Sequence, residues 1–512
     1  MPTTLSTTDP RTGARTDSGI EPTSDEGVDA IVEIAVGAAE QLEQRDRAWR
    51  AGLLDTLADV LEERREQLVA TAEAETGLTS ARLNGELTRT TFQFRLFAEA
   101  VREGGYLEVA IDHAAETPMG PQPDVRRMLV PTGPVAVFGS SNFPFAFSVP
   151  GGDTASALAA GNPVVAKAHS AHILTSKASY EALREGVDRA GGPSGTIGIV
   201  YGQAAGSRLV AHPGLAAVGF TGSLGAAARL REIVEQRERP IPFYGELQSV
   251  NPLIVSADAL RARGEAIATG LAASVTGSAG QLCTKPGIAF VPAGAQADEF
   301  AERLVAAMRE STPGVLLNER VRESFQAAER DLEEADAVES LLGGAVPDAA
   351  SGGFVVEPRV LRVHASKVTP EHTVEAFGPL VLVVDYDDTD QLLGALEAVP
   401  DSLTTTLHVE DSDLPTVQKL LPRIAPTAGR LVFNGYPTGV RVGWAQHHGG
   451  PWPATNSLHT SVGITAIRRF LRPLAWQNAP ESLLPAELRD DYRGIPRRVD
   501  GVLEPAVQVA AH

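Results

Sequence analysis

Cysteine is nearly absent from this chain, because Cys283 is the only one among 512 residues. A single cysteine excludes an internal disulfide and is compatible with a reducing cytoplasm, where we expect the protein to act. No run of residues approaches the 18 uncharged apolar positions of a membrane span. Residues 1–25 are rich in Thr, Ser, Pro, Gly and Asp and lack the basic start and apolar core of a signal peptide. We expect them to form a disordered tail.

Basic residues are also scarce, with 44 Lys and Arg against 65 Asp and Glu and a net charge of −21. This balance argues against a phosphate backbone as partner, so we expect neither nucleic acid nor membrane binding. Five of the 44 basic residues are lysines, which leaves 39 arginines. The length and the 43% hydrophobic content indicate a globular chain with two or three cores.

Cys283 lies in a segment of small residues, Gly277 to Gly287, with the sequence GSAGQLCTKPG. Such a segment brings the backbone close to a ligand and leaves amide N–H groups free to point at it. We expect its thiol to be held more easily as the reactive thiolate than a thiol packed among Leu and Ile. The alternative is a small buried apolar side chain, which is what most lone cysteines are.

Glu246 lies between two short apolar runs that are typical of buried strands. A carboxylate at such a strand end loses solvation, so we expect its pKa to rise toward the range useful to a general base. The alternative is a salt-bridged or solvent-facing acid in a loop.

Amphipathic periodicity predicts three helices first, and short apolar strands then alternate with helices from about residue 134. This alternation predicts a mostly parallel sheet, with ligands at the carboxyl ends of its strands. The expected early helices are 28–42, 53–69 and 83–101, and the expected strands are 135–138, 163–166, 197–201, 216–220 and 241–243. In the second half we expect helices 259–275 and 297–309 and strands 288–291 and 380–386.

Polar residues follow three of these strands. Asn142 follows the first strand, where its amide could donate to an oxyanion or shape a turn. Lys167 follows the second strand, and Gly222 and Ser223 open a helix after the fourth, where free N–H groups would hold a pyrophosphate. That turn does not match the Gly-x-Gly-x-x-Gly fingerprint. No third ligand accompanies the two histidines at 169 and 172, so we expect no metal.

Taken together, four motifs resemble those of the aldehyde dehydrogenase superfamily, and the resemblance covers nearly the whole chain. They are Glu-Leu at 246–247, Gly-Gln-x-Cys at 280–283, Phe-Thr-Gly-Ser at 220–223 and Glu-x-Phe-Gly-Pro at 375–379. The resemblance implies an α/β fold with a parallel-sheet cofactor domain, an α/β catalytic domain and a small β oligomerisation element. The implied boundaries are 26–114 and 132–247 for the cofactor domain, 248–455 for the catalytic domain, and 115–131 with 456–512 for the oligomerisation and C-terminal elements.

The resemblance also implies a chemistry in which Cys283 is the nucleophile, Glu246 is the base, and Asn142 stabilises the oxyanion together with the Cys283 N–H. Glu375 would bind the nicotinamide ribose hydroxyls, and Phe377 would lie beside the nicotinamide ring. The full set of implied cofactor-binding residues is Lys167, Ser170, Arg208, Gly222, Ser223, Glu375 and Phe377.

Ser170 bears on the choice of cofactor. Relatives that prefer NAD usually have a glutamate three residues after the lysine, where it binds the adenosine ribose and repels a 2′-phosphate. Because Ser170 removes that repulsion beside the positive charge of Lys167, we expect NADP to be preferred, with NAD as the alternative. Arg208 follows the third strand and is expected to be an additional phosphate ligand.

The segments 433–439, 449–455 and 468–473 resemble a subgroup that includes α-ketoglutaric semialdehyde (2,5-dioxopentanoate) dehydrogenases. That resemblance implies a homodimer or homotetramer that oxidises this aldehyde to 2-oxoglutarate. The substrate carboxylate would need a positive partner, and 39 arginines are candidates. Residues 441–448 depart from the subgroup, so a general or fatty aldehyde dehydrogenase is the main alternative. A coenzyme A-acylating enzyme and a catalytically silent relative are weaker alternatives, since Cys283, Glu246 and Asn142 are all present.

Overall fold

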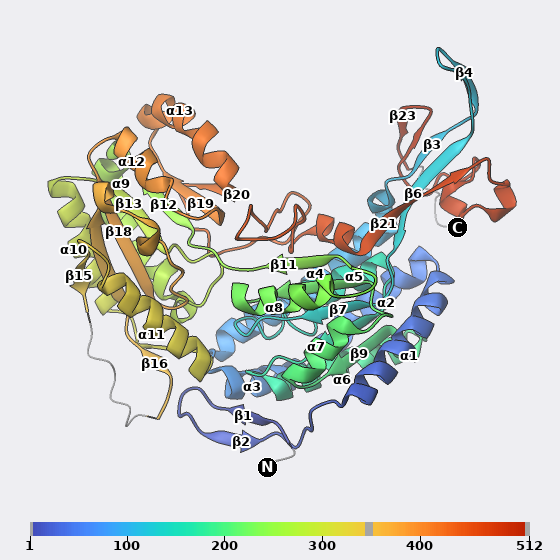
Figure 1. Cartoon of the computed structure of the whole chain (residues 1–512), viewed down its shortest axis with the longest axis horizontal. Coiled ribbons are helices and arrows are strands. Elements are labelled where there is room, and N and C mark those ends of the chain that lie inside the picture. Colours follow the sequence, from blue (N-terminus) through green and yellow to red (C-terminus); the bar gives the residue numbers. More distant parts are fainter. Residues whose placement is uncertain (1–3, 344–351, 507–512) are drawn as a thin grey trace.

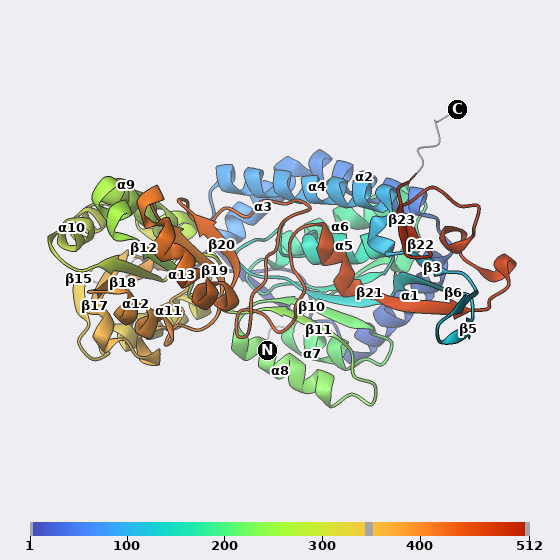
Figure 2. The same ribbon diagram turned by 90° about the horizontal axis from the view of Figure 1, so that it is seen from above.

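The computed structural model describes residues 4–343 and 352–506 and contains three larger β-sheets with helices packed around two of them (Figure 1). A five-stranded sheet and a seven-stranded sheet form two α/β bodies that lie side by side (Figure 2). A second five-stranded sheet extends away from both bodies at the far end of the molecule. The α/β class expected from the alternation of strands and helices is confirmed.

The first sheet is entirely parallel and has the strand order β11-β10-β7-β8-β9. Its register pairs Phe138 with Lys167 and Thr221 with Glu246, so these residues all lie at the carboxyl ends of neighbouring strands. The expected clustering of polar residues at one sheet edge follows from this register. The strands are β7 (Val135–Phe138), β8 (Val164–Lys167), β9 (Ile197–Val200), β10 (Ala217–Thr221) and β11 (Phe243–Glu246).

Alternating side chains of the first sheet pack against helices on opposite faces. In β7, Val135 and Val137 join a large core with one set of helices, while Ala136 and Phe138 join a smaller core with the other set. The first set is α2 (Arg47–Glu63), α3 (Arg65–Thr76), α4 (Ser80–Glu103), α5 (Gly152–Ala160) and α6 (Ile173–Arg189); the second is α1 (Asp25–Glu43), α7 (Gln203–Ala211) and α8 (Leu224–Glu235).

The seven-stranded sheet is parallel except for its edge strand β15, in the order β15-β17-β18-β13-β12-β19-β20. Every residue of β18 is buried, with alternate side chains in two cores on opposite faces. The strands are β12 (Pro252–Val255), β13 (Ile288–Pro292), β15 (Glu339–Leu342), β17 (Arg359–His364), β18 (Leu380–Tyr386), β19 (Ser402–His408) and β20 (Ala428–Phe433). Helices α9 (Ala257–Thr276) and α10 (Ala295–Arg309) cover one face, and α11 (Glu319–Glu333), α12 (Thr389–Leu396) and α13 (Leu414–Ile424) cover the other.

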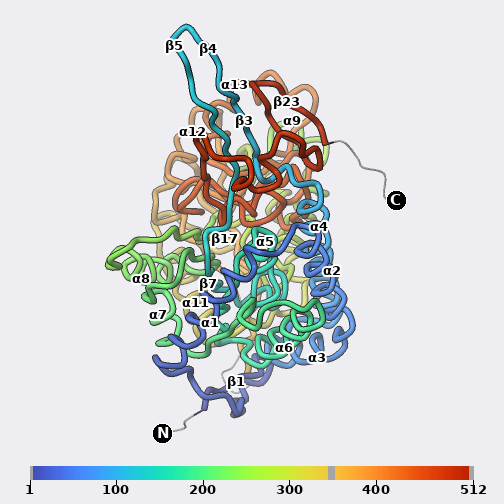
Figure 3. The backbone as a smooth tube through the Cα atoms, turned by 90° about the vertical axis from the view of Figure 1, so that its right-hand side faces the viewer, coloured from blue at the N-terminus to red at the C-terminus, as the bar shows by residue number. Residues whose placement is uncertain are grey.

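The third sheet joins segments that are far apart in the chain, in the order β21-β6-β3-β22-β23. Next to it, a hairpin of β4 and β5 projects beyond the rest of the molecule (Figures 1 and 3). The expected cofactor domain included residues up to 114 and therefore β3. The structure pairs β3 with β6 and β22 of the third sheet. The strands are β3 (Ala110–Asp112), β4 (Ala115–Thr117), β5 (Gly120–Gln122), β6 (Val125–Pro131), β21 (Leu471–Gln477), β22 (Arg497–Val499) and β23 (Val502–Glu504).

The N-terminal segment is ordered where the structure describes it, so the expectation of a disordered tail is wrong for residues 4–25. Strands β1 (Ser6–Thr8) and β2 (Arg15–Asp17) form a hairpin, and Thr7 donates to the buried carboxylate of Glu75 at 2.7 Å. The hairpin also meets the second body, because Phe354 N donates to Pro10 O at 2.8 Å near the short pair β14 (Gly314–Val315) and β16 (Val355–Val356). Polar composition suggested disorder, but backbone pairing and a buried carboxylate hold this segment.

The expected single helix over residues 53–69 is also wrong, because Arg64 separates α2 from α3 with φ −97° and ψ 11°. Apolar spacing continues through one non-helical residue, so the periodicity alone does not reveal the break. No helix in the described part of the chain is both long and apolar enough to cross a membrane.

Candidate active site

Cys283 follows α9 through a tight turn with an unusual backbone. Three consecutive residues have left-handed φ values: Ser278 at 52°, Ala279 at 55° and Gly280 at 70°. A Cβ added to Gly280 would lie 2.2 Å from the backbone carbonyl carbon of Gly378. The glycine of the Gly-Gln-x-Cys motif is therefore required by both its φ and its close contact.

Two buried amide side chains hold the loop that carries Cys283. Gln281 donates from Nε2 to Val315 O at 3.1 Å and accepts at Oε1 from Leu317 N at 2.9 Å. Asn251 donates from Nδ2 to the Cys283 carbonyl oxygen at 2.8 Å. These bonds satisfy backbone groups that the loop would otherwise bury unpaired. Asn251 was not expected from the sequence.

Glu246 is the last residue of β11, and its side chain is almost completely buried, with 3% of the residue exposed. Its Oε1 lies 3.0 Å from His448 Nε2, and its Oε2 accepts from Ser461 Oγ at 2.5 Å. The chain from 448 to 461 runs beside the end of β11, where Leu247 N donates to Ala454 O at 2.9 Å. A segment 200 residues further along the chain thus supplies both side-chain partners of the carboxylate.

These partners reverse the expected pKa of Glu246. Burial raises the pKa, but the charge of His448 and the hydrogen bonds from His448, Ser461 and Cys283 together hold it below the ordinary value of a glutamate. The expected rise in pKa is therefore wrong, because it counted desolvation and not the hydrogen-bond donors around the carboxylate. Glu246 is ionised in this arrangement and can accept a proton.

His448 also lies against Cys283, with 3.5 Å between Nε2 and Sγ. Sγ, Nε2 and a carboxylate oxygen of Glu246 all lie within 4.8 Å of one another. Burial and the nearby Glu246 charge raise the pKa of Cys283 well above its ordinary value, so the expectation of a readily held thiolate is wrong. Activation of the thiol therefore requires a neighbouring base, and Glu246, which accepts a hydrogen bond from the thiol, supplies it. The sequence signal for His448 was the departure of residues 441–448 from the subgroup pattern.

Asn142 lies on the loop after β7 and is buried beside the Cys283 segment. Its Nδ2 donates to the carbonyl oxygen of Gln281 at 2.8 Å, two residues before the cysteine. An amide nitrogen carries two hydrogens, so a second donor is available next to Cys283. Sequence reasoning and the structure therefore agree on bringing Asn142, Cys283 and Glu246 together.

Lys167 ends β8, half-buried and without an ion-pair partner in the described residues. Burial lowers the pKa of Lys167 to about 8. An uncompensated, partly buried ammonium fits a phosphate-bearing cofactor. Ser170, three residues later, is exposed and leaves the surroundings of Lys167 free of the negative charge that a glutamate would add.

The structure places Arg208 in a different role from the expected phosphate ligand. Arg208 lies on α7, and its guanidinium donates to the carboxylate of Asp29 on α1, with 2.8 Å between Nε and Oδ1. This ion pair already compensates its charge, so we do not retain Arg208 as a cofactor residue.

Gly222 and Ser223 connect β10, in the first five-stranded sheet, to α8. Gly222 N donates to the backbone oxygen of Glu246 at 3.0 Å, which ties this turn directly to the end of β11. Ser223 is the N-cap of α8, and its hydroxyl accepts from Ala226 N at 3.4 Å. The first N–H groups of a helix have no carbonyl partner within the helix, and a turn of this kind is a common binding site for a pyrophosphate.

Glu375 and Phe377 approach from the second body, just before β18. Burial raises the pKa of Glu375 to about 7, while a bond from the backbone of Ser249 and the charge of Lys285 oppose the rise. Lys285 is buried and donates to Ala376 O at 3.0 Å, which fixes the chain between Glu375 and Phe377. Both cofactor candidates are therefore held by the segment that follows Cys283.

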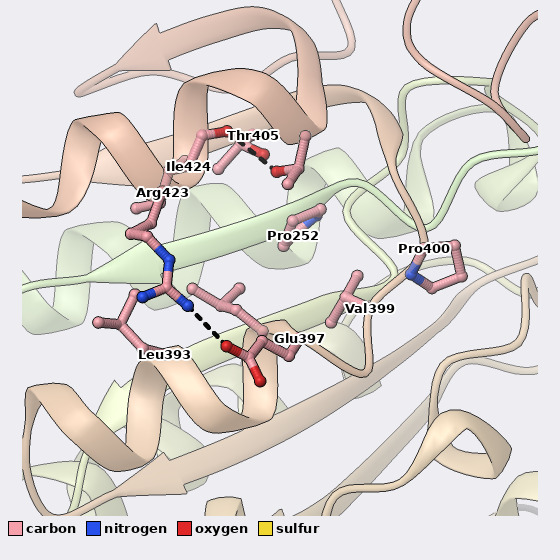
Figure 4. Close-up of a pocket in the computed structure, with 10 residues that line it drawn as sticks. Pro252, Leu393, Glu397, Val399, Pro400, Thr405, Arg423 and Ile424 are labelled. Carbon is pink, nitrogen blue, oxygen red and sulfur yellow. Dashed lines mark hydrogen bonds and ion pairs between the residues drawn. The ribbon is translucent and has the colours of Figure 1, made fainter.

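A pocket in the second body contains none of these residues (Figure 4). It lies between α12 and α13, and its lining includes Arg423 and Glu397, which form an ion pair at 2.6 Å. Its lining is largely apolar and carries no nucleophile, so we do not connect it with the chemistry around Cys283.

A half-buried cysteine, a buried carboxylate and a buried imidazole meet where the two α/β bodies approach each other, which is the arrangement of an α/β enzyme with a cysteine nucleophile. The model of the aldehyde dehydrogenase family matches residues 2–452. The chain is 42% identical to "Alpha-ketoglutaric semialdehyde dehydrogenase 2" of Azospirillum brasilense, covering 98% of this chain and 96% of that protein. It is 41% identical to "Alpha-ketoglutaric semialdehyde dehydrogenase" of Acinetobacter baylyi, covering 93% and 91%.

Solved structures share the fold. PnpE in complex with nicotinamide adenine dinucleotide superposes with a TM-score of 0.80 and 25% identity, covering 93% of this chain and 95% of that one. The NADP-dependent glyceraldehyde-3-phosphate dehydrogenase from Bacillus halodurans, complexed with NADP, has a TM-score of 0.78 and 23% identity, covering 93% and 96%.

This chain belongs to the aldehyde dehydrogenase family. It is an NAD(P)-dependent enzyme that oxidises an aldehyde to the corresponding acid.

Proposed function

We propose that this enzyme oxidises 2,5-dioxopentanoate to 2-oxoglutarate with NADP as cofactor. The observation that carries the substrate assignment is the identity of 41–42% over more than nine-tenths of the chain with two enzymes named for this aldehyde. The residues around Cys283 supply the groups that the oxidation of an aldehyde through a thioester requires.

In the proposed mechanism, the thiol proton of Cys283 passes to Glu246 as the sulfur bonds to the aldehyde carbon. Asn142 Nδ2 and the Cys283 N–H donate to the oxyanion that forms, and one such donor contributes about 2.7–4 kcal/mol. Lys167, Gly222, Ser223, Glu375 and Phe377 would hold the nicotinamide cofactor, which would supply the acceptor for the hydride from the same carbon and leave the acyl group on Cys283 as a thioester. Glu246 releases the thiol proton to solvent and then takes a proton from water while the water oxygen bonds to the acyl carbon. The C–S bond breaks as the acid forms, and the thiolate of Cys283 takes the proton back from Glu246.

His448 supports both halves of this sequence. Its Nε2 lies 3.0 Å from Glu246 and 3.5 Å from the Cys283 sulfur, so one imidazole contacts both the base and the nucleophile. Both contacts use the same ring nitrogen, so an Nε2–H that donates to Glu246 cannot also accept the thiol proton. We therefore assign His448 to holding Glu246 ionised, and Glu246 to taking the proton of the thiol.

The preference for NADP rests on Lys167 and Ser170. Lys167 is a half-buried cation without an acidic partner in the described residues, and Ser170 carries no charge that would repel a 2′-phosphate. Charge-assisted bonds to the phosphate would contribute about 1.5–3 kcal/mol. Kinetics with each cofactor test the assignment: a kcat/KM for NAD equal to or above that for NADP would contradict it.

The substrate is tested by kcat/KM for 2,5-dioxopentanoate, glutaraldehyde and hexanal at saturating NADP. We expect 2,5-dioxopentanoate to exceed hexanal at least tenfold, about 1.4 kcal/mol. A kcat/KM for hexanal equal to or above that of the oxo acid would leave only a general aldehyde dehydrogenase. Turnover that requires added coenzyme A would instead indicate the acylating class, which the buried base Glu246 disfavours.

We also propose that the protein is a homodimer or homotetramer in the cytoplasm, where Cys283 stays reduced. The β4–β5 hairpin projects from the body and exposes 84% of Met119 at its tip, and β21 leaves one side of its sheet unpaired within the described chain. Light scattering after size exclusion measures the assembly, and a monomer at micromolar concentration would contradict it.

A further inference from the structure

Arg89 is a buried cation near the proposed active site whose terminal nitrogens have no hydrogen-bond partner. It lies on α4, and both Nη1 and Nη2 are inaccessible and unpaired among the residues that the structure describes. An unpaired buried guanidinium is costly, so such a group is a candidate for binding an anion.

The neighbouring carboxylate of Glu86 does not satisfy this arginine. Glu86 Oε1 accepts from the backbone N–H groups of Phe145 and Ala146 at 2.8 and 2.9 Å. Its Oε2 accepts from Arg82 at 2.6 Å. The acid one turn before Arg89 is therefore fully occupied by other donors, and the fork of Arg89 remains available.

The guanidinium lies on the side of α4 that faces the nucleophile. Its Cζ lies 5.1 Å from the ring centroid of Phe147, and that ring lies 6.1 Å from the ring of His448. His448 in turn contacts the sulfur of Cys283 at 3.5 Å. Phe147 thus contacts both Arg89 and the histidine that lies against the nucleophile, so the guanidinium belongs to the surroundings of Cys283. Burial lowers the pKa of Arg89, and the charge of Glu86, followed by those of Cys283 and Glu246, opposes this lowering.

Two other arginines near the site are already engaged. Arg82 donates to Ser278 Oγ at 2.8 Å and to the Asn142 carbonyl at 2.8 Å. The charge of Cys283 also opposes the lowering of the pKa of Arg430 by burial. The terminal nitrogens of Arg430, however, donate to the carbonyl oxygens at 437 and 439. Among these three arginines, Arg89 is the one with a free fork.

Gln93, one turn further along α4, adds a second donor on the same side. Its Nε2 is also buried and unpaired among the described residues, and it lies against Gly152, where it would be 2.4 Å from an added Cβ. Residues four apart lie on one helix face, so Arg89 and Gln93 present two unpaired donors to the same region.

We propose that Arg89 is the specificity-determining residue that binds the carboxylate at the far end of the substrate, with Gln93 donating beside it. This inference rests on the proposed function and names the partner of the 2-oxo acid group. The planar guanidinium binds the carboxylate through two parallel N–H hydrogen bonds. An aldehyde that ends in a methyl group cannot form these bonds, so Arg89 does not increase its affinity.

The test compares the ratio of kcat/KM for 2,5-dioxopentanoate to that for pentanal, a five-carbon aldehyde without the acid, at saturating NADP. Arg89→Met keeps the length of the side chain and removes the charge, and Arg89→Lys keeps the charge and removes the fork. Arg95→Met is the matched control, because Arg95 lies on the same helix and pairs with Asp59 at an exposed position. We expect Arg89→Met to lower the ratio at least tenfold, Arg89→Lys to lower it less, and Arg95→Met to leave it at the wild-type value.

Each part of the proposal fails by a different outcome. A wild-type enzyme that prefers pentanal overturns the proposed function. A wild-type enzyme that prefers the oxo acid, with the ratio preserved in both Arg89 variants, overturns the role of Arg89 and leaves the proposed function standing. Melting temperature and NADP binding of each variant report folding. If Arg89→Met does not fold, Arg89→Lys tests the role of Arg89. The additional measurement is the inhibition constant of 2-oxoglutarate in the reaction with pentanal, which should rise at least fivefold in Arg89→Lys. An unchanged inhibition constant overturns the role of Arg89.

Discussion

Replacing His448 by Phe tests the arrangement around the base most directly. Phenylalanine keeps an aromatic ring at the site but removes Nε2, which lies 3.0 Å from Glu246 and 3.5 Å from Cys283. Glu246 would keep Ser461 as a hydrogen-bonding partner but would lose both a donor and a nearby positive charge. Because burial raises the pKa of Glu246 and His448 opposes that rise, the pKa should move upward in the variant.

The size of the effect follows from the lost hydrogen bond. A hydrogen bond to a charged group contributes about 1.5–3 kcal/mol, and each tenfold change corresponds to about 1.4 kcal/mol. On the acid side of the profile, the fraction of ionised Glu246 should therefore fall about tenfold to a hundredfold, and kcat should fall with it. At higher pH the carboxylate ionises again, so the loss in kcat should shrink. The rate of the first turnover should also fall on the acid side, because less of the ionised Glu246 that takes the thiol proton is present.

The assay is kcat against pH at saturating substrate and cofactor, with the burst of reduced cofactor measured by stopped flow. His447→Phe is the matched control, since this neighbouring histidine is half-buried and has no side-chain hydrogen bond to Glu246 or Cys283 in the described structure. We expect the acid limb to move to higher pH in the His448 variant and to stay in place in the control. An unchanged acid limb together with a burst at the wild-type rate would refute the role of His448.

Four further outcomes follow from the same structure. Glu246→Gln should lower steady-state turnover about a hundredfold or more, because the base acts on the thioester. A slower burst of reduced cofactor should persist, since the thiol can still lose its proton to solvent; a complete loss of the burst would contradict this. KM for NADP should rise as pH passes from about 7 to about 9, because burial lowers the pKa of Lys167 to about 8 and the ammonium is lost above it; an equal rise for NAD would count against the phosphate contact. Ser170→Glu should lower kcat/KM for NADP at least about tenfold and shift the preference to NAD, and retained NADP preference would refute the reading of this position. Gly280→Ala should lower the melting temperature markedly, because Gly280 has φ +70° and a backbone atom would lie 2.2 Å from the added Cβ. Gly225→Ala is the control and should not lower it, since no atom lies within 4 Å of its added Cβ. Similar melting temperatures for the two variants would disprove the constraint at Gly280.

The sequence by itself determined the class of fold and the positions of the central residues. Strand β18 (Leu380–Tyr386) was expected with the bounds that the structure shows, because a run of apolar residues before a turn is a local signal. Asn142, Lys167 and Gly222 follow strands of one parallel sheet, so their shared edge could be inferred from the alternation of strands and helices. Cys283 and Glu246 are also brought together as their motifs implied.

The tertiary structure alone decided how these residues are charged and which partners they have. His448 is 165 residues from Cys283 and 202 from Glu246 in the chain, so no local pattern could assign it to either. It reverses the sign of the pKa shift of Glu246, because hydrogen-bond donors near a buried carboxylate are set by packing and not by its own sequence neighbours.

Packing between distant parts of the chain also decides which arginines have an acidic partner. Composition gave 39 equivalent candidates, and only their surroundings separate Arg208, paired with Asp29, from Arg89, buried with its fork unpaired in the described structure. Whether a guanidinium is compensated depends on which acids the fold brings within about 4 Å, and those acids come from distant parts of the chain.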